Sequence, residues 1–208
     1  MKYRLAVFDF DGTLADSFPW VLSIQHQVAQ KFHLPAYKRA EIERFRGLDI
    51  KQVLAMADLS PWKVAQIGRY ARHLMGEQAS QIPLFAGVDH LLTRLVRKGV
   101  TLAVVSSNSR DNVCTVLGPA NSACFSYYEC GVSLFGKAAK LRKVLRHSDI
   151  PPGEAIMIGD EVRDLLAAHA AHMAAGAVTW GFNHRAALQA EHPDLIFSRV
   201  EEIAEYLA

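Results

Sequence analysis

The sequence predicts an α/β fold, a Rossmann-like parallel sheet core flanked by helices, with an all-helical cap domain inserted after the first strand. Short apolar runs alternate with helical patterns from residue 84 onward, and this alternation is typical of a parallel sheet. The segment 17–84 interrupts the alternation with helical patterns only. Two aspartates directly follow the first apolar run, which indicates a functional site at the end of that strand.

The first strand is expected at Tyr3–Phe8, an apolar run that leads into the stretch "VFDFDGTLADS". Gly12 then predicts a turn that ends the strand. Neighbouring like charges such as Asp9 and Asp11 repel and raise one another's pKa, so a purely structural strand gains nothing from them. We therefore expect this strand end to bind a ligand, to react, or both.

Later apolar runs predict the remaining strands of the sheet. The four clearest are 100–107, 154–160, 175–180 and 194–198, and 123–128 is a weaker candidate. Helical patterns lie between them at 88–99, 137–148 and 162–173. The first of these helices carries one leucine-rich stripe and reaches Gly99, a typical stop.

The segment 17–84, called the helical cap below, contains four helical patterns and no strand pattern. Ser60 followed by Pro61 is a good helix start within it. We expect two domains, a core of residues 1–16 and 85–208 and the helical cap of residues 17–84. The cap holds nine Lys/Arg and five Asp/Glu, a net +4, and the rest of the chain is −2. A basic cap over an acidic core suits an anionic substrate, although ordinary variation in surface charge explains it equally well.

Composition excludes several classes of protein. The 208 residues carry a net charge of only +2, without a block of like charges, which argues against a nucleic-acid partner. No apolar stretch is long enough for a membrane span, and charges in the first apolar run argue against a signal peptide. Three cysteines without metal-ligand spacing fit reduced thiols. We expect a cytoplasmic protein, a monomer or homodimer, without nucleic-acid or membrane partners.

Four carboxylates should meet at one edge of the sheet, because ligands of parallel sheets gather beyond the carboxyl ends of the strands. Asp9 and Asp11 lie at one such end, and Asp160 and Asp164 follow another in "IGDEVRD". Converging carboxylates without matching cations would be destabilising. An all-oxygen site of this kind is what Mg²⁺ prefers. The sequence therefore predicts a magnesium site.

The motifs "DFDGTLADS", "VVSSN", Lys137 and "IGDEVRD" occur in the order and spacing that resemble the haloacid dehalogenase-like hydrolase superfamily. Within it, the chain is most similar to the branch of phosphoglycolate phosphatases and beta-phosphoglucomutases, which have a helical cap after the first motif. "LFAGVDHLL" and "VTWGFN" add to the similarity with phosphoglycolate phosphatases. The resemblance covers nearly the whole chain.

The resemblance implies roles for the first motif. Asp9 would be the nucleophile that forms an aspartyl phosphate, and Asp11 would be the general acid and then the general base. Asp11 would also offer its backbone carbonyl to Mg²⁺ beside Asp9 and Asp160. Thr13 is expected among the substrate-binding residues, where its hydroxyl fixes the turn.

The later motifs would hold the phosphate. Ser106 would donate a hydrogen bond to a phosphoryl oxygen, and Ser107 and Asn108 would offer backbone N–H groups. Lys137 would neutralise the phosphate and Asp9. Many relatives have a proline after this lysine, whereas this chain continues "GKAAKLRK", so Lys140 is an open alternative.

Two further residues complete the predicted site. Asp164 lies one helical turn after Asp160, from where it would orient the site without binding the metal directly. "FRGLD" resembles a loop of family caps that faces the active site, and Arg46 in this loop is the candidate for substrate selection.

The resulting hypothesis is a Mg²⁺-dependent phosphatase that hydrolyses a small phosphorylated metabolite, phosphoglycolate above all, through an aspartyl phosphate. The alternatives are a phosphosugar mutase of the beta-phosphoglucomutase type and a non-catalytic binding protein. No convincing set of sugar-binding polar groups surrounds "RGLDIKQVL", which disfavours the mutase. A degenerate binding protein would be expected to lack one of Asp9, Asp11, Lys137 and Asp160, and all four are present.

Overall fold

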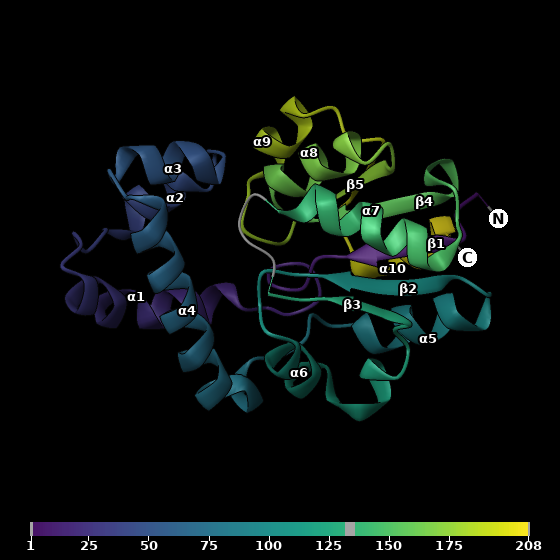
Figure 1. Cartoon of the computed structure of the whole chain (residues 1–208), viewed down its shortest axis with the longest axis horizontal. Coiled ribbons are helices and arrows are strands. Elements are labelled where there is room, and N and C mark those ends of the chain that lie inside the picture. The colour runs from purple at the N-terminus through teal and green to yellow at the C-terminus, as the bar shows by residue number, and fades with distance from the viewer. Residues whose placement is uncertain (1, 132–135, 208) are drawn as a thin grey trace.

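The computed structural model describes residues 2–131 and 136–207, and it contains one six-stranded sheet with the order β3-β2-β1-β4-β5-β6 (Figure 1). All five strand pairings are parallel. The strands are β1 Leu5–Phe8, β2 Thr101–Val105, β3 Tyr127–Glu129, β4 Ala155–Gly159, β5 Ala174–Val178 and β6 Leu195–Phe197. The predicted α/β fold is confirmed.

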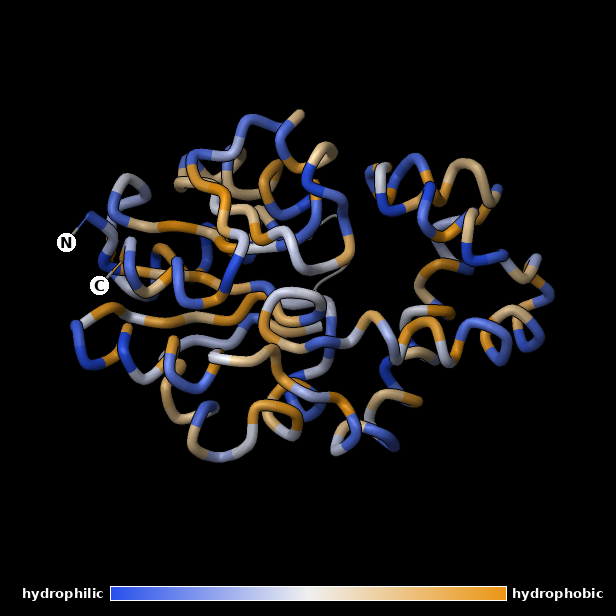
Figure 2. Tube along the Cα trace, turned by 180° about the vertical axis from the view of Figure 1, so that it is seen from behind, coloured by the Kyte–Doolittle hydropathy of each residue, from blue (hydrophilic) through white to orange (hydrophobic). Residues whose placement is uncertain are grey.

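In the described parts of the chain, six helices cover the two faces of the sheet. They are α5 Val88–Arg97, α6 Arg110–Ser122, α7 Lys137–Ser148, α8 Val162–Ala170, α9 Arg185–Ala190 and α10 Val200–Leu207. Alternate residues of β1 point to opposite faces, as a strand requires. Ala6 and Phe8 pack with α5, α6 and α10, whereas Leu5 and Val7 pack with α7, α8 and α9. Figure 2 shows the resulting apolar strands at the centre of the core.

The strand order places the site. β1 lies between β2 and β4, and Phe8 at its end pairs with Val104 on one side and Ile158 on the other. The chain leaves β1 and β4 at the same edge and continues into Asp9 and Asp160. The order of the strands reverses at this point, where parallel sheets usually bind ligands.

The helical cap contains α1 Phe18–Phe32, α2 Arg39–Phe45, α3 Ile50–Met56 and α4 Pro61–Gln78, followed by a short 3₁₀ turn Ala79–Gln81. Ser60 caps α4 as expected, since its hydroxyl accepts the backbone N–H of Lys63 at 3.3 Å. The four helices lie together at one end of the molecule, beyond the carboxyl ends of the strands (Figure 1).

Two antiparallel stretches of chain connect the helical cap to the core. Asp16 donates its backbone N–H to Pro83, and Phe85 donates its backbone N–H to Leu14, both at 2.9 Å. The cap is therefore attached through one narrow two-stranded crossing. The division of the chain at residues 16 and 85 stays a prediction.

The helices α9 and α10 were not predicted, and the weaker strand candidate 123–128 overlaps β3 only at Tyr127 and Tyr128. The other predicted elements of the core differ from the observed ones at their ends. The strands are shorter than the apolar runs, since Glu154 belongs to a 3₁₀ turn and the run 194–198 forms only three strand residues. The helix expected at 162–173 ends at Ala170, because His172 has a left-handed backbone with φ 58° and Met173 leads into β5. Among the described residues, no helix is long and apolar enough to cross a membrane.

Candidate active site

Asp9 stands at the centre of a buried ion-pair cluster. Lys137, the first residue of α7, places its Nζ 2.8 Å from Asp9 Oδ2 and 2.5 Å from Asp164 Oδ1. All three side chains are almost completely inaccessible. Burial alone would lower the pKa of Lys137, but the charges of Asp164 and Asp9 raise it above its ordinary value. Lys137 is therefore a fixed positive charge beside Asp9.

The turn after β1 orients the Asp9 carboxylate. The backbone N–H of Phe10 donates to Asp9 Oδ1 at 2.8 Å. Oδ2 is buried and accepts no aligned hydrogen bond from the described residues, although it is paired with Lys137. One carboxylate oxygen is thus anchored, and the other has capacity for a metal ion or for reaction.

Asp160, the residue after β4, is held from two sides. Thr13 donates its hydroxyl to Asp160 Oδ1 at 2.6 Å, and the backbone N–H of Phe182 donates to Oδ2 at 2.8 Å. Burial and the negative charges of Glu161 and Asp9 raise the pKa of Asp160 well above its ordinary value. The one hydroxyl hydrogen of Thr13 goes to Asp160, so substrate binding by Thr13 stays a prediction.

Gly12 and Gly181 approach Asp160 too closely for any side chain. A Cβ atom added to either residue would lie within about 2.3 Å of the Asp160 carboxylate. Gly12 also has φ 77°, a left-handed backbone that glycine adopts without cost. The turn after β1 thus closes tightly over Asp160 because it carries a glycine.

Asp11 has different surroundings from Asp9, although only one residue separates them. Asn108 donates its amide to Asp11 Oδ2 at 3.1 Å, and Oδ1 is buried without an aligned hydrogen bond. Burial and the charge of Asp9 raise the pKa of Asp11 to about 6, although the hydrogen bond from Asn108 and the nearby Ser17 hydroxyl oppose the shift. A carboxyl with such a pKa can hold a proton and release it near neutral pH, as a general acid must.

The loop after β2 places Ser106 at the same edge of the sheet. Its buried hydroxyl accepts the backbone N–H of Asn108 at 3.0 Å, which leaves its own hydrogen free to be donated. The backbone N–H of Asn108, expected to face the phosphate, is therefore used within the loop. The Asn108 side chain is used as well, since its Oδ1 accepts from Asn112 at 2.9 Å.

Carboxylate oxygens of Asp9, Asp160 and Asp164 lie within 4.8 Å of one another, all buried. Together with the hydrogen-bond capacity left on Asp9 Oδ2, this donor set fits a small, hard divalent cation. Asp164 is already held by Lys137 and by the backbone N–H of Glu161 at 3.1 Å. Burial raises the pKa of Asp164 to about 6, with Lys137 opposing the shift. Asp9 and Asp160 stay the predicted ligands, and the contact of Asp164 with Lys137 fits its predicted supporting role.

Comparison with known proteins identifies the family. The family model described as "Haloacid dehalogenase-like hydrolase" matches residues 6–178. The chain belongs to this family. It is 32% identical over 200 residues to a phosphoglycolate phosphatase of Synechococcus elongatus, covering 96% of this chain and 94% of that protein.

More distant relatives of the hydrolase cover the chain equally well. A protein of Bacillus cereus named pyrophosphatase PpaX is 24% identical over 215 residues, which is 100% of this chain and 98% of that one. The crystal structure of a predicted phosphatase from Clostridium acetobutylicum superposes with a TM-score of 0.84 at 22% identity, covering 100% and 99% of the two chains. The predicted superfamily, its capped phosphoglycolate-phosphatase-like branch and the prediction of an enzyme are therefore confirmed.

The two candidate lysines of this hydrolase have separate partners. Lys140 Nζ pairs with Glu129 at 2.9 Å, and Lys143 pairs with the same carboxylate at 2.6 Å. Glu129 ends β3, at the edge of the sheet, whereas Asp9 follows the central β1. The geometry favours Lys137 over Lys140 as the lysine of the active site.

Arg46 lies between the helical cap and the core. Its Nε and Nη2 donate to the carbonyl oxygens of Phe182 and Gly181 at 2.8 and 2.9 Å, and its Nη1 lies 3.2 Å from Glu43. Its guanidinium also stacks over Phe18, 4.8 Å from the ring centroid. Because these contacts occupy its donors, substrate selection by Arg46 stays a prediction that this geometry does not favour.

A cleft of roughly 890 Å³ lies between the helical cap and the core, with Asp11 among its lining residues. Sequence reasoning missed the four cations that line it, Lys51 on α3, Arg69 and Arg72 on α4 and Arg163 on α8. Arg163 pairs with Glu161 at 2.5 Å, and its buried Nε has no hydrogen bond in the described chain. Arg163 lies inside the quoted motif "IGDEVRD", so its position beside Asp160 and Asp164 was a usable signal. No sequence motif marks Arg72, since only the fold brings α4 to the edge of the sheet where the carboxylates lie.

Proposed function

We propose that this protein is a Mg²⁺-dependent phosphatase that hydrolyses a small phosphorylated metabolite of the phosphoglycolate type through an aspartyl phosphate. The observation that carries the proposal is the contrast between Asp9 and Asp11. Asp9 is ion-paired with Lys137 at 2.8 Å, whereas the buried Asp11 has a pKa raised to about 6. One carboxylate thus has a buried cation beside it, and its neighbour is able to carry a proton.

In the first step, an oxygen of Asp9 attacks phosphorus, and the bond from phosphorus to the alcohol oxygen breaks. Asp11 donates its proton to that leaving oxygen. In the second step, water attacks the phosphorus of the aspartyl phosphate, and Asp11 takes a proton from this water. The bond between phosphorus and the Asp9 oxygen breaks, which releases inorganic phosphate and restores the Asp9 carboxylate. The Ser106 hydroxyl, whose hydrogen is free, donates to a phosphoryl oxygen, and Lys137 balances the charge of Asp9.

Asp9, Asp160 and the backbone carbonyl of Asp11 would hold the Mg²⁺. The ion supplies positive charge that offsets the carboxylates and the phosphoryl oxygens. Thr13, Phe182 and Asp164 keep this donor set in place, through the contacts described above. The all-oxygen donor set supports Mg²⁺, and it also suits Ca²⁺ and Mn²⁺.

The lining of the cleft weighs against a phosphosugar mutase. The helical cap contributes mainly aliphatic and aromatic side chains to it: Trp20, Val21, Ile50, Leu54, Leu59, Val64 and Ile67. The charged side chains that the cap adds to this lining are three cations, Lys51, Arg69 and Arg72, and one carboxylate, Asp58. This excess of cations suits a second anion better than the neutral hydroxyls of a sugar. A non-catalytic binding protein is disfavoured because Asp9, Asp11, Lys137 and Asp160 are all present at one sheet edge. A cytoplasmic location and a monomeric or homodimeric state remain predictions.

A panel of phosphorylated metabolites tests the proposal. Phosphoglycolate, phosphosugars and pyrophosphate are incubated with the protein and Mg²⁺, and both inorganic phosphate and isomerised phosphosugars are measured. We expect phosphate release, fastest from phosphoglycolate, and none from the Asp9→Asn variant, because an amide cannot attack phosphorus. Isomerisation without net phosphate release would establish the mutase instead. Unimpaired turnover by Asp9→Asn would rule out the aspartyl phosphate.

A further inference from the structure

Two arginines of the helical cap face the cleft from the same side of α4. Arg69 and Arg72 are three residues apart, which puts them on one face of the helix, and both line the cleft. The guanidinium of Arg72 is partly buried, whereas Arg69 is exposed. The charge of Arg69 adds to burial in lowering the pKa of Arg72. The two side chains thus concentrate positive charge at the cap side of the cleft.

These arginines lack the carboxylate partners that other arginines of the site have. Arg46 pairs with Glu43 and Arg163 pairs with Glu161, at 3.2 and 2.5 Å. Across residues 2–131 and 136–207, neither Arg69 nor Arg72 forms an ion pair, and the one hydrogen bond from the Arg72 guanidinium is long. Its Nη1 lies 3.4 Å from the carbonyl oxygen of Ser107. A partly buried guanidinium with so little compensation has most of its donors free for an anion.

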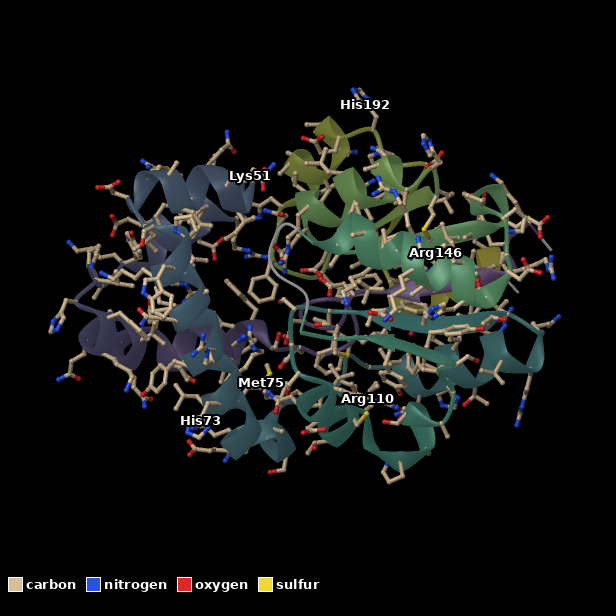
Figure 3. All side chains as sticks on the ribbon, viewed as in Figure 1. Lys51, His73, Met75, Arg110, Arg146 and His192 are labelled. Carbon is tan, nitrogen blue, oxygen red and sulfur yellow. The ribbon has the colours of Figure 1, made fainter. Side chains whose placement is uncertain are left out.

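Arg72 is also held beside the loop that would bind the phosphate. Its backbone carbonyl accepts the side-chain amide of Asn112 at 2.8 Å, and the same amide donates to Asn108. On its own helix, Arg72 Nη1 would lie only 3.3 Å from a Cβ atom at Gly68, so the absence of a side chain there makes room for the guanidinium. Met75, one turn further along α4, also contacts Asn108, and Figure 3 shows it at the junction with the core.

We propose that Arg72, assisted by Arg69, is a specificity-determining residue that binds a second anionic group of the substrate. Because the guanidinium lies against Ser107, this group must be joined to the phosphate by a short linker. The class of substrate is therefore a small phosphorylated carboxylic acid, for which the planar guanidinium offers two parallel hydrogen bonds. A diphosphate presents the same chemistry, a second anion close to the reacting one. This inference rests on the proposed function, because it assumes that the phosphoryl group binds beside Ser106.

Binding of two phosphonates tests the role of Arg72 without turnover. 3-Phosphonopropionate has the shape of phosphoglycolate but cannot be hydrolysed at oxygen, and propylphosphonate lacks only its carboxylate. Calorimetry on the Mg²⁺-loaded protein should show that the carboxylate improves affinity by about 10- to 100-fold, the range of a charged hydrogen-bonded pair. The Arg72→Gln variant should lose this preference, and Arg72→Lys, which keeps the charge without the fork, should retain part of it.

Arg39→Gln is the matched control. Arg39 is an exposed arginine of α2 outside the cleft lining, and its replacement removes the same charge from the helical cap. This variant should keep the full preference for 3-phosphonopropionate. Equal weakening of both phosphonates by Arg72→Gln would overturn the proposal, because Arg72 would then bind the phosphoryl group itself. An unchanged preference would overturn it as well. If Arg72→Gln fails to fold, Arg72→Lys decides between these outcomes.

Kinetics then identify the second anion and separate the two proposals. With phosphoglycolate, pyrophosphate and ethyl phosphate as substrates, Arg72→Gln should raise KM for the first or the second by about 10- to 100-fold and leave ethyl phosphate within about twofold. If KM rises more for phosphoglycolate, Arg72 binds a carboxylate, and if KM rises more for pyrophosphate, it binds a phosphate. An equal loss on all three substrates would contradict the role of Arg72. Absence of phosphatase activity in the unmodified protein would refute the proposed function, whereas the phosphonate preference would still be measured.

Discussion

Phe182 joins the helical cap to the carboxylate cluster. Its carbonyl oxygen accepts from Arg46 Nε at 2.8 Å, and its backbone N–H donates to Asp160 Oδ2, also at 2.8 Å. Its ring packs against Phe18 at the start of α1, with 5.2 Å between centroids. The position of the cap and the orientation of Asp160 therefore depend on the same short segment after β5.

The first prediction concerns Arg46. Replacing it with methionine removes the hydrogen bonds to Gly181 and Phe182 and should lower the free energy of unfolding by about 1–3 kcal/mol. Arg46→Lys keeps the positive charge but has no planar guanidinium to reach both carbonyl oxygens. Its free energy of unfolding should therefore lie between those of the parent and Arg46→Met. Urea unfolding measures both variants. An Arg46→Met protein as stable as the parent would show that the contact between cap and core contributes nothing to stability.

The second prediction concerns the Thr13–Asp160 hydrogen bond of 2.6 Å. Thr13→Val has nearly the same shape but cannot donate, so Asp160 loses one of the two groups that orient it. Loss of such a supporting hydrogen bond typically weakens metal binding by about 10- to 100-fold. The Mg²⁺ concentration that gives half-maximal activity, and the Mg²⁺-dependent rise in Tm, should both shift accordingly. Thr13→Ser keeps the hydroxyl and should behave like the parent, and an equal shift in both variants would contradict the assigned contact.

The third prediction separates Lys137 from Lys140. Lys137→Met leaves Asp9 and Asp164 buried without their cation, a loss that typically costs about 3–5 kcal/mol, and it should also abolish turnover. Lys140→Met removes a pair that is partly exposed, and Lys143 remains on Glu129. Its effect on stability should stay within about 1 kcal/mol, with activity intact. Denaturant unfolding and phosphate release measure both, and the reverse pattern would assign the active-site lysine to Lys140.

Much of the site could be predicted because it lies at strand ends. Asp9 directly follows β1, Ser106 follows β2 and Asp160 follows β4. The reversal of strand order brings these three strand ends together. An apolar run followed by a polar residue is a local pattern that the sequence displays directly. The lysine at the start of α7 is equally local, and only the choice between Lys137 and Lys140 required the contacts of the fold.

The contacts that sequence reasoning missed are those between distant segments. The Thr13 hydroxyl could serve substrate or protein equally well, and the sequence does not display its 2.6 Å contact with Asp160. Arg46 occurs in a loop that resembles substrate-facing loops, yet the carbonyls of Gly181 and Phe182 take its donors. Arg72 carries no motif at all, since its relation to Ser107 depends on how the cap helices pack on the core.

The last prediction concerns Asp11 and begins with its effect on the free energy of unfolding. Because the folded protein raises the pKa of Asp11 from its ordinary 3.8 to about 6, it binds this proton more tightly than the unfolded chain does. Stability from this group is thus complete below pH 4 and falls as the pH rises from about 4 to 6. In metal-free protein, Asp11→Asn should therefore raise the free energy of unfolding by up to about 3 kcal/mol at pH 7.5 and by almost nothing at pH 4. Equal effects at both pH values would show that Asp11 ionises normally.

The same variant should lose activity in a way that depends on the leaving group. Asp9 can still attack phosphorus in Asp11→Asn, so a slow enzyme remains, and loss of general acid–base help typically costs about 10²- to 10⁴-fold in rate. The loss should be largest with phosphoglycolate, whose alkoxide needs a proton, and smaller with p-nitrophenyl phosphate, whose leaving group does not. With the latter substrate, hydrolysis of the intermediate becomes limiting, and phosphorylated Asp9 should be visible by mass spectrometry. Equal losses on both substrates, without a trapped intermediate, would make Asp11 a structural residue despite its raised pKa.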